Sequence, residues 1–150
     1  MSTKILVTIL AFSVLAGCSK DKFTSKPQLT YKKVNTKFLS NNETLTFTLG
    51  VTDLEGDVQD SLWVQEIVKG CSSSNSGFTS KYKMPDFNAT KNLQGDIEIC
   101  YAYGLNLGCP AIVHSGCVNR NDTATFRFWM QDKAKNKSDT IVSDQVVISK

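Results

Sequence analysis

TLTFTLGV, residues 44–51, decides the fold because apolar side chains occupy every second position and threonines fill most of the places between. Alternation with period two places Leu45, Phe47, Leu49 and Val51 on one face, as a half-buried β-strand requires. No helix-period pattern follows the first twenty residues. Further β-rich runs occur at 61–69, 96–103, 123–130 and 140–148, with weaker ones at 29–38 and 78–84. About seven short strands predict an all-β fold, an antiparallel immunoglobulin-like β-sandwich.

The first seventeen residues have the layout of a secretory signal peptide. Lys4 supplies the positive charge, an apolar run follows from 5 to 16, and small residues come next. This run is shorter than the roughly 20 apolar residues of a membrane-spanning helix. We therefore expect residues 1–17 to be a helical targeting segment that is removed.

Leu15, Ala16, Gly17 and Cys18 spell LAGC, which resembles the lipobox of bacterial lipoproteins. That resemblance implies a lipid thioether on Cys18, further acyl chains such as palmitate, and anchoring to the membrane through lipid. Ser19 resembles the outer-membrane sorting pattern, so the expected localisation is the outer membrane, facing the periplasm or the surface. An ordinary signal with a chance cysteine is the alternative. Residues 18–27 have the composition of a flexible tether, and residues 28–150 fit one domain.

Charge excludes one class of partner. The chain has a net charge of +3, and its lysines are scattered rather than clustered. An electrostatic nucleic-acid binder needs a clustered basic face, so we expect no nucleic-acid partner.

Besides Cys18, the sequence holds an even number of cysteines: Cys71, Cys100, Cys109 and Cys117. In an oxidising compartment such a set predicts two disulfides, for which three pairings exist. We favour Cys109 with Cys117, which closes a short loop, and hence Cys71 with Cys100. A four-cysteine zinc site is the competing interpretation, but the sequence lacks the close CxxC-type pairs that such sites use.

Two longer stretches carry a second resemblance. FRFWMQDKAKNKSDTIVSDQVVI, residues 126–148, resembles the closing hairpin of bacterial immunoglobulin-like and fibronectin-type-III-like domains, although Lys135 stands where glycine is usual. FTLGVTDLEGDVQDS, residues 47–61, resembles a strand and acidic loop of Bacteroidota lipoproteins of this sandwich type. Neither match is specific to one activity, and fold analogy alone gives no function.

The acidic loop is the main candidate site. Asp53, Glu55 and Asp57 alternate around Gly56, and oxygen ligands in this pattern suit Ca²⁺. In a seven-strand sandwich the last hairpin reaches the same end, which would add Asp132 to the set. The other interpretation is that these residues are simply turn formers. The sequence therefore predicts no cofactor other than a possible Ca²⁺ ion.

We expect no enzyme, because no catalytic set is recognisable. His114, the one histidine, lacks a positioned nucleophile and acid and is interpreted as a surface residue. Glu43, Glu66 and Glu98 have no distinguishing context. The alternative is a small secreted hydrolase, or an inhibitor of one that inserts the cysteine-rich loop 104–120 into a partner.

The remaining candidates concern the surface. Trp129 alternates with Phe128 and Met130 and should face outward, where an exposed tryptophan would suit a partner or sugar; we expect a loop or the N-terminal strand to cover it. Ser61, Thr123 and Thr140 each follow an aspartate, resembling the O-glycosylation pattern of Bacteroidota. The sequence as a whole predicts a non-catalytic binding or structural module at the cell envelope, with an unidentified protein or glycan partner.

Overall fold

The alternating segments form strands close to their predicted bounds. A computed structural model describes residues 22–69, 77–104, 108–112 and 120–150. Within these ranges the strands are β1 (Gln28–Val34), β2 (Phe38–Leu39), β3 (Glu43–Asp53), β4 (Ser61–Lys69), β5 (Thr79–Lys83), β6 (Leu93–Tyr103), β7 (Asp122–Gln131), β8 (Ile141–Val142) and β9 (Val146–Ile148).

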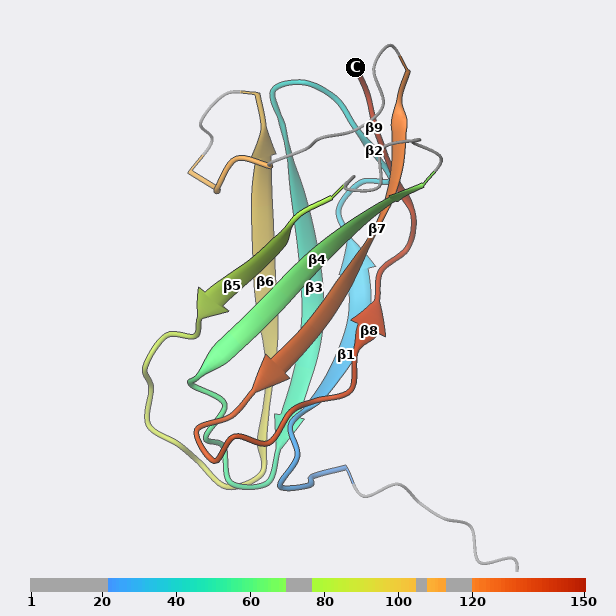
Figure 1. The fold of residues 1–150 in the computed structure, drawn as a ribbon. Coiled ribbons are helices and arrows are strands. Elements are labelled where there is room, and N and C mark those ends of the chain that lie inside the picture. Colours follow the sequence, from blue (N-terminus) through green and yellow to red (C-terminus); the bar gives the residue numbers. More distant parts are fainter. Residues whose placement is uncertain (1–21, 70–76, 105–107, 113–119) are drawn as a thin grey trace, which may run out of the picture.

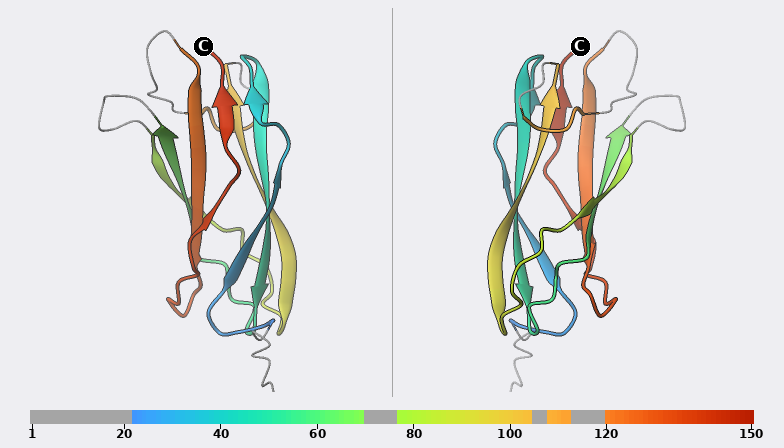
Figure 2. Two further views of the ribbon diagram at one scale, coloured as in Figure 1. Left: turned by 90° about the vertical axis from the view of Figure 1, so that its right-hand side faces the viewer. Right: turned by 90° about the vertical axis from the view of Figure 1, so that its left-hand side faces the viewer.

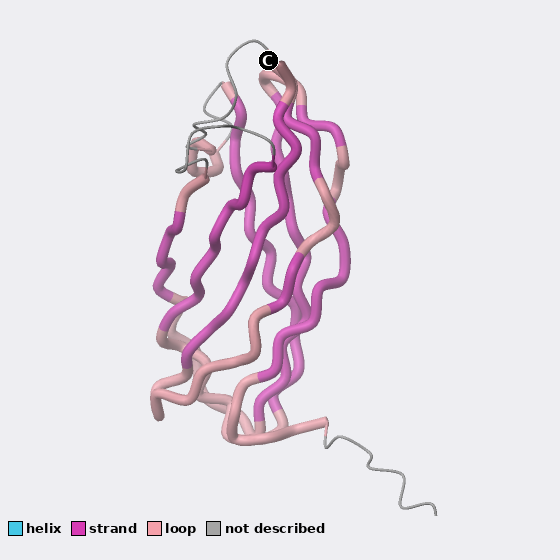
Figure 3. The backbone as a smooth tube through the Cα atoms, turned by 45° about the vertical axis from the view of Figure 1, so that its right-hand side comes forward, coloured by secondary structure: helices cyan, strands magenta, loops and turns pink. Residues whose placement is uncertain are grey.

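These strands make two facing sheets, seen edge-on in Figure 2. One sheet has the order β1-β3-β6, and the other has the order β2-β9-β7-β4-β5, with β8 also paired to β7. All pairs are antiparallel except β2 with β9. The described chain consists of strands and loops (Figure 3), and none of it is a helix long and apolar enough to cross a membrane. The prediction of an all-β, antiparallel immunoglobulin-like sandwich is confirmed.

Two segments that were each predicted as one strand are divided in the structure. The segment 29–38 splits, because β1 joins the smaller sheet while β2 crosses to the larger one. The segment 140–148 splits at Ser143, whose hydroxyl oxygen accepts a hydrogen bond from the Phe126 amide at 2.9 Å. The Ser143 hydroxyl takes the place of a backbone carbonyl as the acceptor for the Phe126 amide, so the pairing with β7 is interrupted and β8 and β9 are separate strands.

Aromatic side chains from both sheets fill the core. Phe47 of β3 lies 4.7 Å from Phe126 and 5.2 Å from Phe128, measured between ring centroids, and all three are fully buried. Full burial of one such side chain contributes about 1.5–3 kcal/mol. The alternating apolar positions that define the strands in sequence are therefore the ones that join the sheets.

The sandwich has two ends, which Figure 1 shows at the bottom and the top of the view. We call the lower end the one where β3 and β7 finish, and the upper end the one where β7 begins and the chain terminates. Residues 22–27, the described part of the predicted tether, contact the lower end. The Thr24 carbonyl accepts a hydrogen bond from Leu54 N at 3.1 Å, and the Ser25 carbonyl accepts one from the Asn136 side chain at 3.0 Å.

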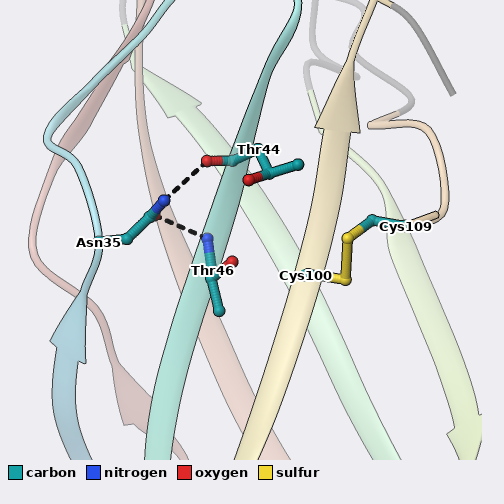
Figure 4. The surroundings of a disulfide bond; sticks show 5 residues. All are labelled: Asn35, Thr44, Thr46, Cys100 and Cys109. Carbon is teal, nitrogen blue, oxygen red and sulfur yellow. Dashed lines mark hydrogen bonds between the residues drawn. A yellow bond between two sulfur atoms is a disulfide. The ribbon is translucent and has the colours of Figure 1, made fainter. Parts of the chain in front are cut away.

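The disulfide pairing differs from the prediction. Cys100 of β6 is bonded to Cys109, and their Cα atoms are 5.5 Å apart (Figure 4). The favoured pairs, Cys109 with Cys117 and Cys71 with Cys100, are therefore wrong. The segment 109–112 lies along the edge of β6 and runs parallel to it, so that Ala102 N donates to the Pro110 carbonyl at 2.8 Å. This placement brings Cys109 beside Cys100, whereas loop length alone hardly separated the two choices. Cys71 and Cys117 lie outside the described residues.

Candidate metal centre

A tight turn after β3 holds the first carboxylate of the lower end. Asp53 Oδ1 accepts hydrogen bonds from the backbone amides of Gly56, at 2.6 Å, and Asp57, at 3.3 Å. Gly56 has φ +74°, and a Cβ atom there would lie 2.1 Å from the Thr90 carbonyl oxygen. Only glycine fits this position, so the sequence D-x-x-G-D fixes the turn and points Asp53 inward.

The hairpin after β7 holds the second carboxylate. Asp132 Oδ1 accepts from Asn136 N at 2.7 Å, and Oδ2 accepts from the Asn136 side-chain amide at 2.8 Å. The two loops are joined directly, because Lys133 N donates to the Asp57 carbonyl at 2.9 Å. Asp132 and Asn136, which belong to the stretch that resembles the closing hairpin of immunoglobulin-like domains, thus have a physical role. They close the turn, and the closed turn lies against the acidic loop.

Three carboxylates converge as a result. Asp53, Asp57 and Asp132 each offer an oxygen, and these oxygens lie within 4.8 Å of one another. Asp53 and Asp132 are fully buried, and Asp57 is half-buried. Asp53 Oδ2 is buried and has no hydrogen-bond partner among the residues that the structure describes. That orphaned oxygen is an acceptor without a donor, which a cation would satisfy.

Electrostatics at this centre favour a positive ligand. Burial, and secondarily the charges of Asp57 and Glu55, raises the pKa of Asp53 above its ordinary value, although two backbone hydrogen bonds act in the opposite direction. In the described part of the chain, none of the three converging carboxylates forms an ion pair. Among the described residues, backbone amides and the Asn136 side-chain amide donate to Asp53 and Asp132, and none of these donors carries a full positive charge.

Glu55 is not part of this cluster. Its side chain is exposed and accepts a hydrogen bond from the Ser25 hydroxyl at 2.7 Å. Asp60, which follows in the same loop, is also outside, since Lys135 Nζ lies 2.7 Å from its carboxylate and lowers its pKa. Of the predicted metal ligands Asp53, Glu55, Asp57 and Asp132, the structure brings together the three aspartates.

The predicted glycan acceptors differ in accessibility. Ser61 is buried, and its hydroxyl donates to Asp60 at 3.1 Å, an arrangement that opposes glycan attachment. Thr123 is half-buried in β7, and Thr140 is exposed. Cys18 and His114 lie outside the described residues, as does most of the cysteine-rich loop 104–120.

Glu66 is a buried acid that the sequence analysis did not single out. It is 3% exposed on the inner face of β4, and neither carboxylate oxygen has a hydrogen-bond partner within the described ranges. Burial, together with the nearby Asp122 charge, raises the pKa of Glu66 to about 7. Its signal was present, because the period that buries Leu62 and Val64 also buries position 66.

One cavity is separate from both acidic groups. It has a volume of about 560 Å³, and residues of β4, β5 and β6 contribute to its lining. Most of its wall is apolar, with contributions from Leu62, Tyr82, Met84, Phe87 and Ile97. The converging aspartates are absent from this lining, so the cavity and the candidate metal centre are distinct features.

Comparisons with known proteins identify no family for this chain. No family model matches the chain, and no curated protein matches it. Two solved structures are similar in fold: the sporulation control protein Spo0M from Bacillus subtilis and the CARDB domain of the PF1109 protein from Pyrococcus furiosus, the latter in complex with di-metal ions. Spo0M gives a TM-score of 0.47 at 5% identity over 85% of this chain, and the CARDB domain gives 0.30 at 11% over 84%. This chain spans 51% of the Spo0M chain and 91% of the CARDB chain.

Proposed function

We propose that this chain is a non-catalytic binding or structural module of the bacterial cell envelope, whose lower end binds Ca²⁺ through Asp53, Asp57 and Asp132. Two observations carry the cation part: three carboxylate oxygens converge within 4.8 Å, and Asp53 also has a buried Oδ2 with no hydrogen-bond partner among the described residues. Calcium accepts six to eight oxygen ligands in flexible geometry, so waters complete the shell.

A cation here would act on the loops rather than on a substrate. Asp53, where β3 meets the 54–60 turn, and Asp132, in the 132–136 hairpin, are both buried, and a shared ion would link the two loops in addition to the Lys133–Asp57 backbone hydrogen bond. Thr24 and Ser25 bond to the same two loops. Calcium would therefore stiffen the end of the domain from which the segment toward Cys18 leaves.

The thermal test uses the full-length purified protein in EDTA or in about 10 mM Ca²⁺. A site with a Kd of about 1 mM then contributes about 1.4 kcal/mol, which corresponds to a rise in Tm of about 4 °C. Asp57→Asn removes the half-buried ligand without deleting the Asp53 cap, and its calcium-dependent shift should be close to zero.

Glu55→Gln is the matched control, because it removes a negative charge from the same loop but not from the cluster. This variant should keep the full shift. A wild-type Tm that is the same in calcium and EDTA would refute the cation site, and an equal loss in both variants would reduce it to a general charge effect.

Membrane attachment rests on the LAGC sequence at 15–18. Its test is cell fractionation of the wild type and Cys18→Ala, combined with the intact mass of the purified protein. We expect the wild type in the outer-membrane fraction with an acylated Cys18 as its first residue, and the variant released from it. A wild-type mass that retains residues 1–17 without lipid would contradict the proposal.

A further inference from the structure

Both tryptophans of the chain lie side by side on the outer face of the larger sheet. Trp63 of β4 and Trp129 of β7 are direct cross-strand neighbours, with ring centroids 6.1 Å apart and planes inclined by only 6°. The period of β7 predicted that Trp129 faces outward, and both indoles are half-buried rather than covered. The expected cover by the N-terminal strand is not found, because β1 belongs to the opposite sheet.

Cations surround this aromatic pair. Lys81 of β5 places its Nζ 5.1 Å from the centroid of the Trp63 ring. On the other side, a shallow hollow of about 310 Å³ is lined by Gln65, Arg127, Trp129, Lys137, Ser138 and Thr140. We call Lys81, Trp63, Trp129, Arg127 and Lys137 the tryptophan stripe.

The charges of the stripe are not neutralised within the described part of the chain. Lys81, Arg127 and Lys137 take part in no ion pair there, whereas other lysines, such as Lys32 and Lys135, each pair with an aspartate. The lining of the hollow contains no carboxylate. A face that joins aromatic rings with unpaired cations is complementary to a ligand that has both a planar apolar surface and negative charge.

We propose that the tryptophan stripe binds an acidic polysaccharide whose pyranose rings carry carboxylates. The apolar C–H face of a pyranose stacks on the Trp129 indole, while a ring carboxylate meets the guanidinium of Arg127, which accepts carboxylates in a bidentate manner. Lys137 and Lys81 meet carboxylates of neighbouring sugar units along the polymer. This ligand class goes beyond the proposed function and does not depend on the cation centre at the lower end.

Tryptophan fluorescence reports the stripe alone, since the chain contains only Trp63 and Trp129. Full-length protein is titrated with polygalacturonate in EDTA, so that calcium cannot bridge protein and polymer. We expect a saturable change in emission, protection from iodide quenching, and weaker binding as NaCl rises from about 50 to about 500 mM. Calorimetry supplies a second readout for variants that lose an indole.

Trp129→Ala and Arg127→Gln should each weaken binding at least about tenfold, the change that about 1.4 kcal/mol produces. Phe38→Ala and Lys33→Gln are the matched controls, because they remove an exposed aromatic ring and an exposed cation away from the stripe, and they should bind as the wild type does. Circular dichroism confirms folding, and Trp129→Phe replaces Trp129→Ala if the latter unfolds.

Two further polymers test whether binding needs both the pyranose ring and the carboxylate, or only one of the two. Dextran has pyranose rings without charge, and polyglutamate has carboxylates without pyranose rings; both should bind at least about tenfold more weakly than polygalacturonate. The proposal is overturned if polygalacturonate gives no saturable signal, if polyglutamate or dextran binds equally well, or if the stripe variants bind like the controls. Because calcium is absent, none of these outcomes bears on the cation centre.

Discussion

At the lower end of the sandwich the buried carboxylates lie where strands end and two loops meet, whereas at the upper end they lie on the inner faces of strands. Asp53 and Asp132 each accept backbone hydrogen bonds, and their oxygens converge with that of Asp57. Among the described residues no donor reaches the Glu66 carboxylate, and Asp122 lies 3.3 Å from the Lys150 ammonium. Buried acids are therefore stabilised by amide donors at the lower end, and at the upper end by protonation of Glu66 and by the Lys150 ammonium beside Asp122.

This difference follows from where each side chain originates. A loop can turn its amides toward a carboxylate, because its backbone donors are not used by a sheet ladder. A strand uses its amides in pairing, so an acid on the inner face meets mainly apolar neighbours. For Glu66 these surroundings include the ring of Tyr101, whose own pKa is raised by burial and by its hydrogen bond with Tyr82. Burial without donors makes the neutral acid the favoured form of Glu66.

Of the proposed substitutions, Glu66→Gln should therefore change the folding stability most. If it does not, burial of Glu66 does not destabilise the upper end, and the contrast between the two ends is wrong. The pKa of Glu66 rises from 4.5 in the unfolded chain to about 7 in the folded one. A raised carboxyl pKa means that the folded state is favoured at low pH and loses stability as the pH rises from 4.5 through about 7. At about 1.4 kcal/mol per unit, the loss is about 3 kcal/mol.

Chemical denaturation of the two proteins at pH 5 and pH 8 measures this effect. The glutamine variant should match the wild type within about 1 kcal/mol at pH 5 and exceed it by about 2–3 kcal/mol at pH 8. Asp96→Asn, an exposed acid paired with Lys32, serves as the control and should show no such pH-dependent gain. A difference between Glu66→Gln and the wild type that does not change with pH would remove titration of Glu66 as the cause.

The second-largest expected effect is the stabilisation of the lower end by calcium, which should depend on pH. Calcium binds the ionised carboxylates, so the stabilisation of about 1.4 kcal/mol expected at about 10 mM Ca²⁺ is present near neutral pH. It is lost as the pH falls through the pKa of Asp53, which burial has raised, so the loss begins above the ordinary value of 3.8. Calorimetric Tm values in calcium and in EDTA across this range provide the measurement.

The two ends should respond independently to calcium. Addition of Ca²⁺ should leave the pH-dependent advantage of Glu66→Gln unchanged, because the cation centre and Glu66 lie on different parts of the fold. Additivity of two distant effects is the expectation for sites without shared partners. A calcium effect that disappears in Glu66→Gln would show that the ion acts at the upper end instead.

The sequence carried most of the fold because alternation of period two was clear in the central strands. Leu45, Phe47 and Leu49 were assigned to the core from their spacing alone, and all are fully buried. It also placed Asp132 near Asp53 by topology, without any local contact between them in sequence. Glu66 could have been found in the same way, but a run of apolar residues on both faces of β4 concealed its register.

Other features depended on long-range geometry that spacing does not contain. Cys100 pairs with Cys109 because the segment 109–112 lies along the edge of β6, and the composition of the sequence does not predict this placement. Glu55 lies outside the aspartate cluster because its side chain is directed toward Ser25, a contact that the spacing of the loop does not predict. The stacking of Trp63 on Trp129 required the register between β4 and β7, which pairs these two residues directly.

The smallest expected effect concerns the hairpin that positions Asp132. Lys135 has φ +73°, the left-handed conformation in which glycine is usual for this hairpin pattern. A side chain in that region costs about 1–2 kcal/mol, and a glycine variant would regain this energy. The greater entropy of its unfolded chain would offset about 0.5–1 kcal/mol of that gain. Lys135→Gly also loses its ion pair with Asp60, worth at most about 1 kcal/mol for a surface pair. Measured in an Asp60→Asn background, where that pair is already absent, the substitution should stabilise the protein by about 0.5 kcal/mol in denaturant unfolding. A loss of stability there would mean that the lysine stem contributes packing to the lower end that outweighs its backbone strain.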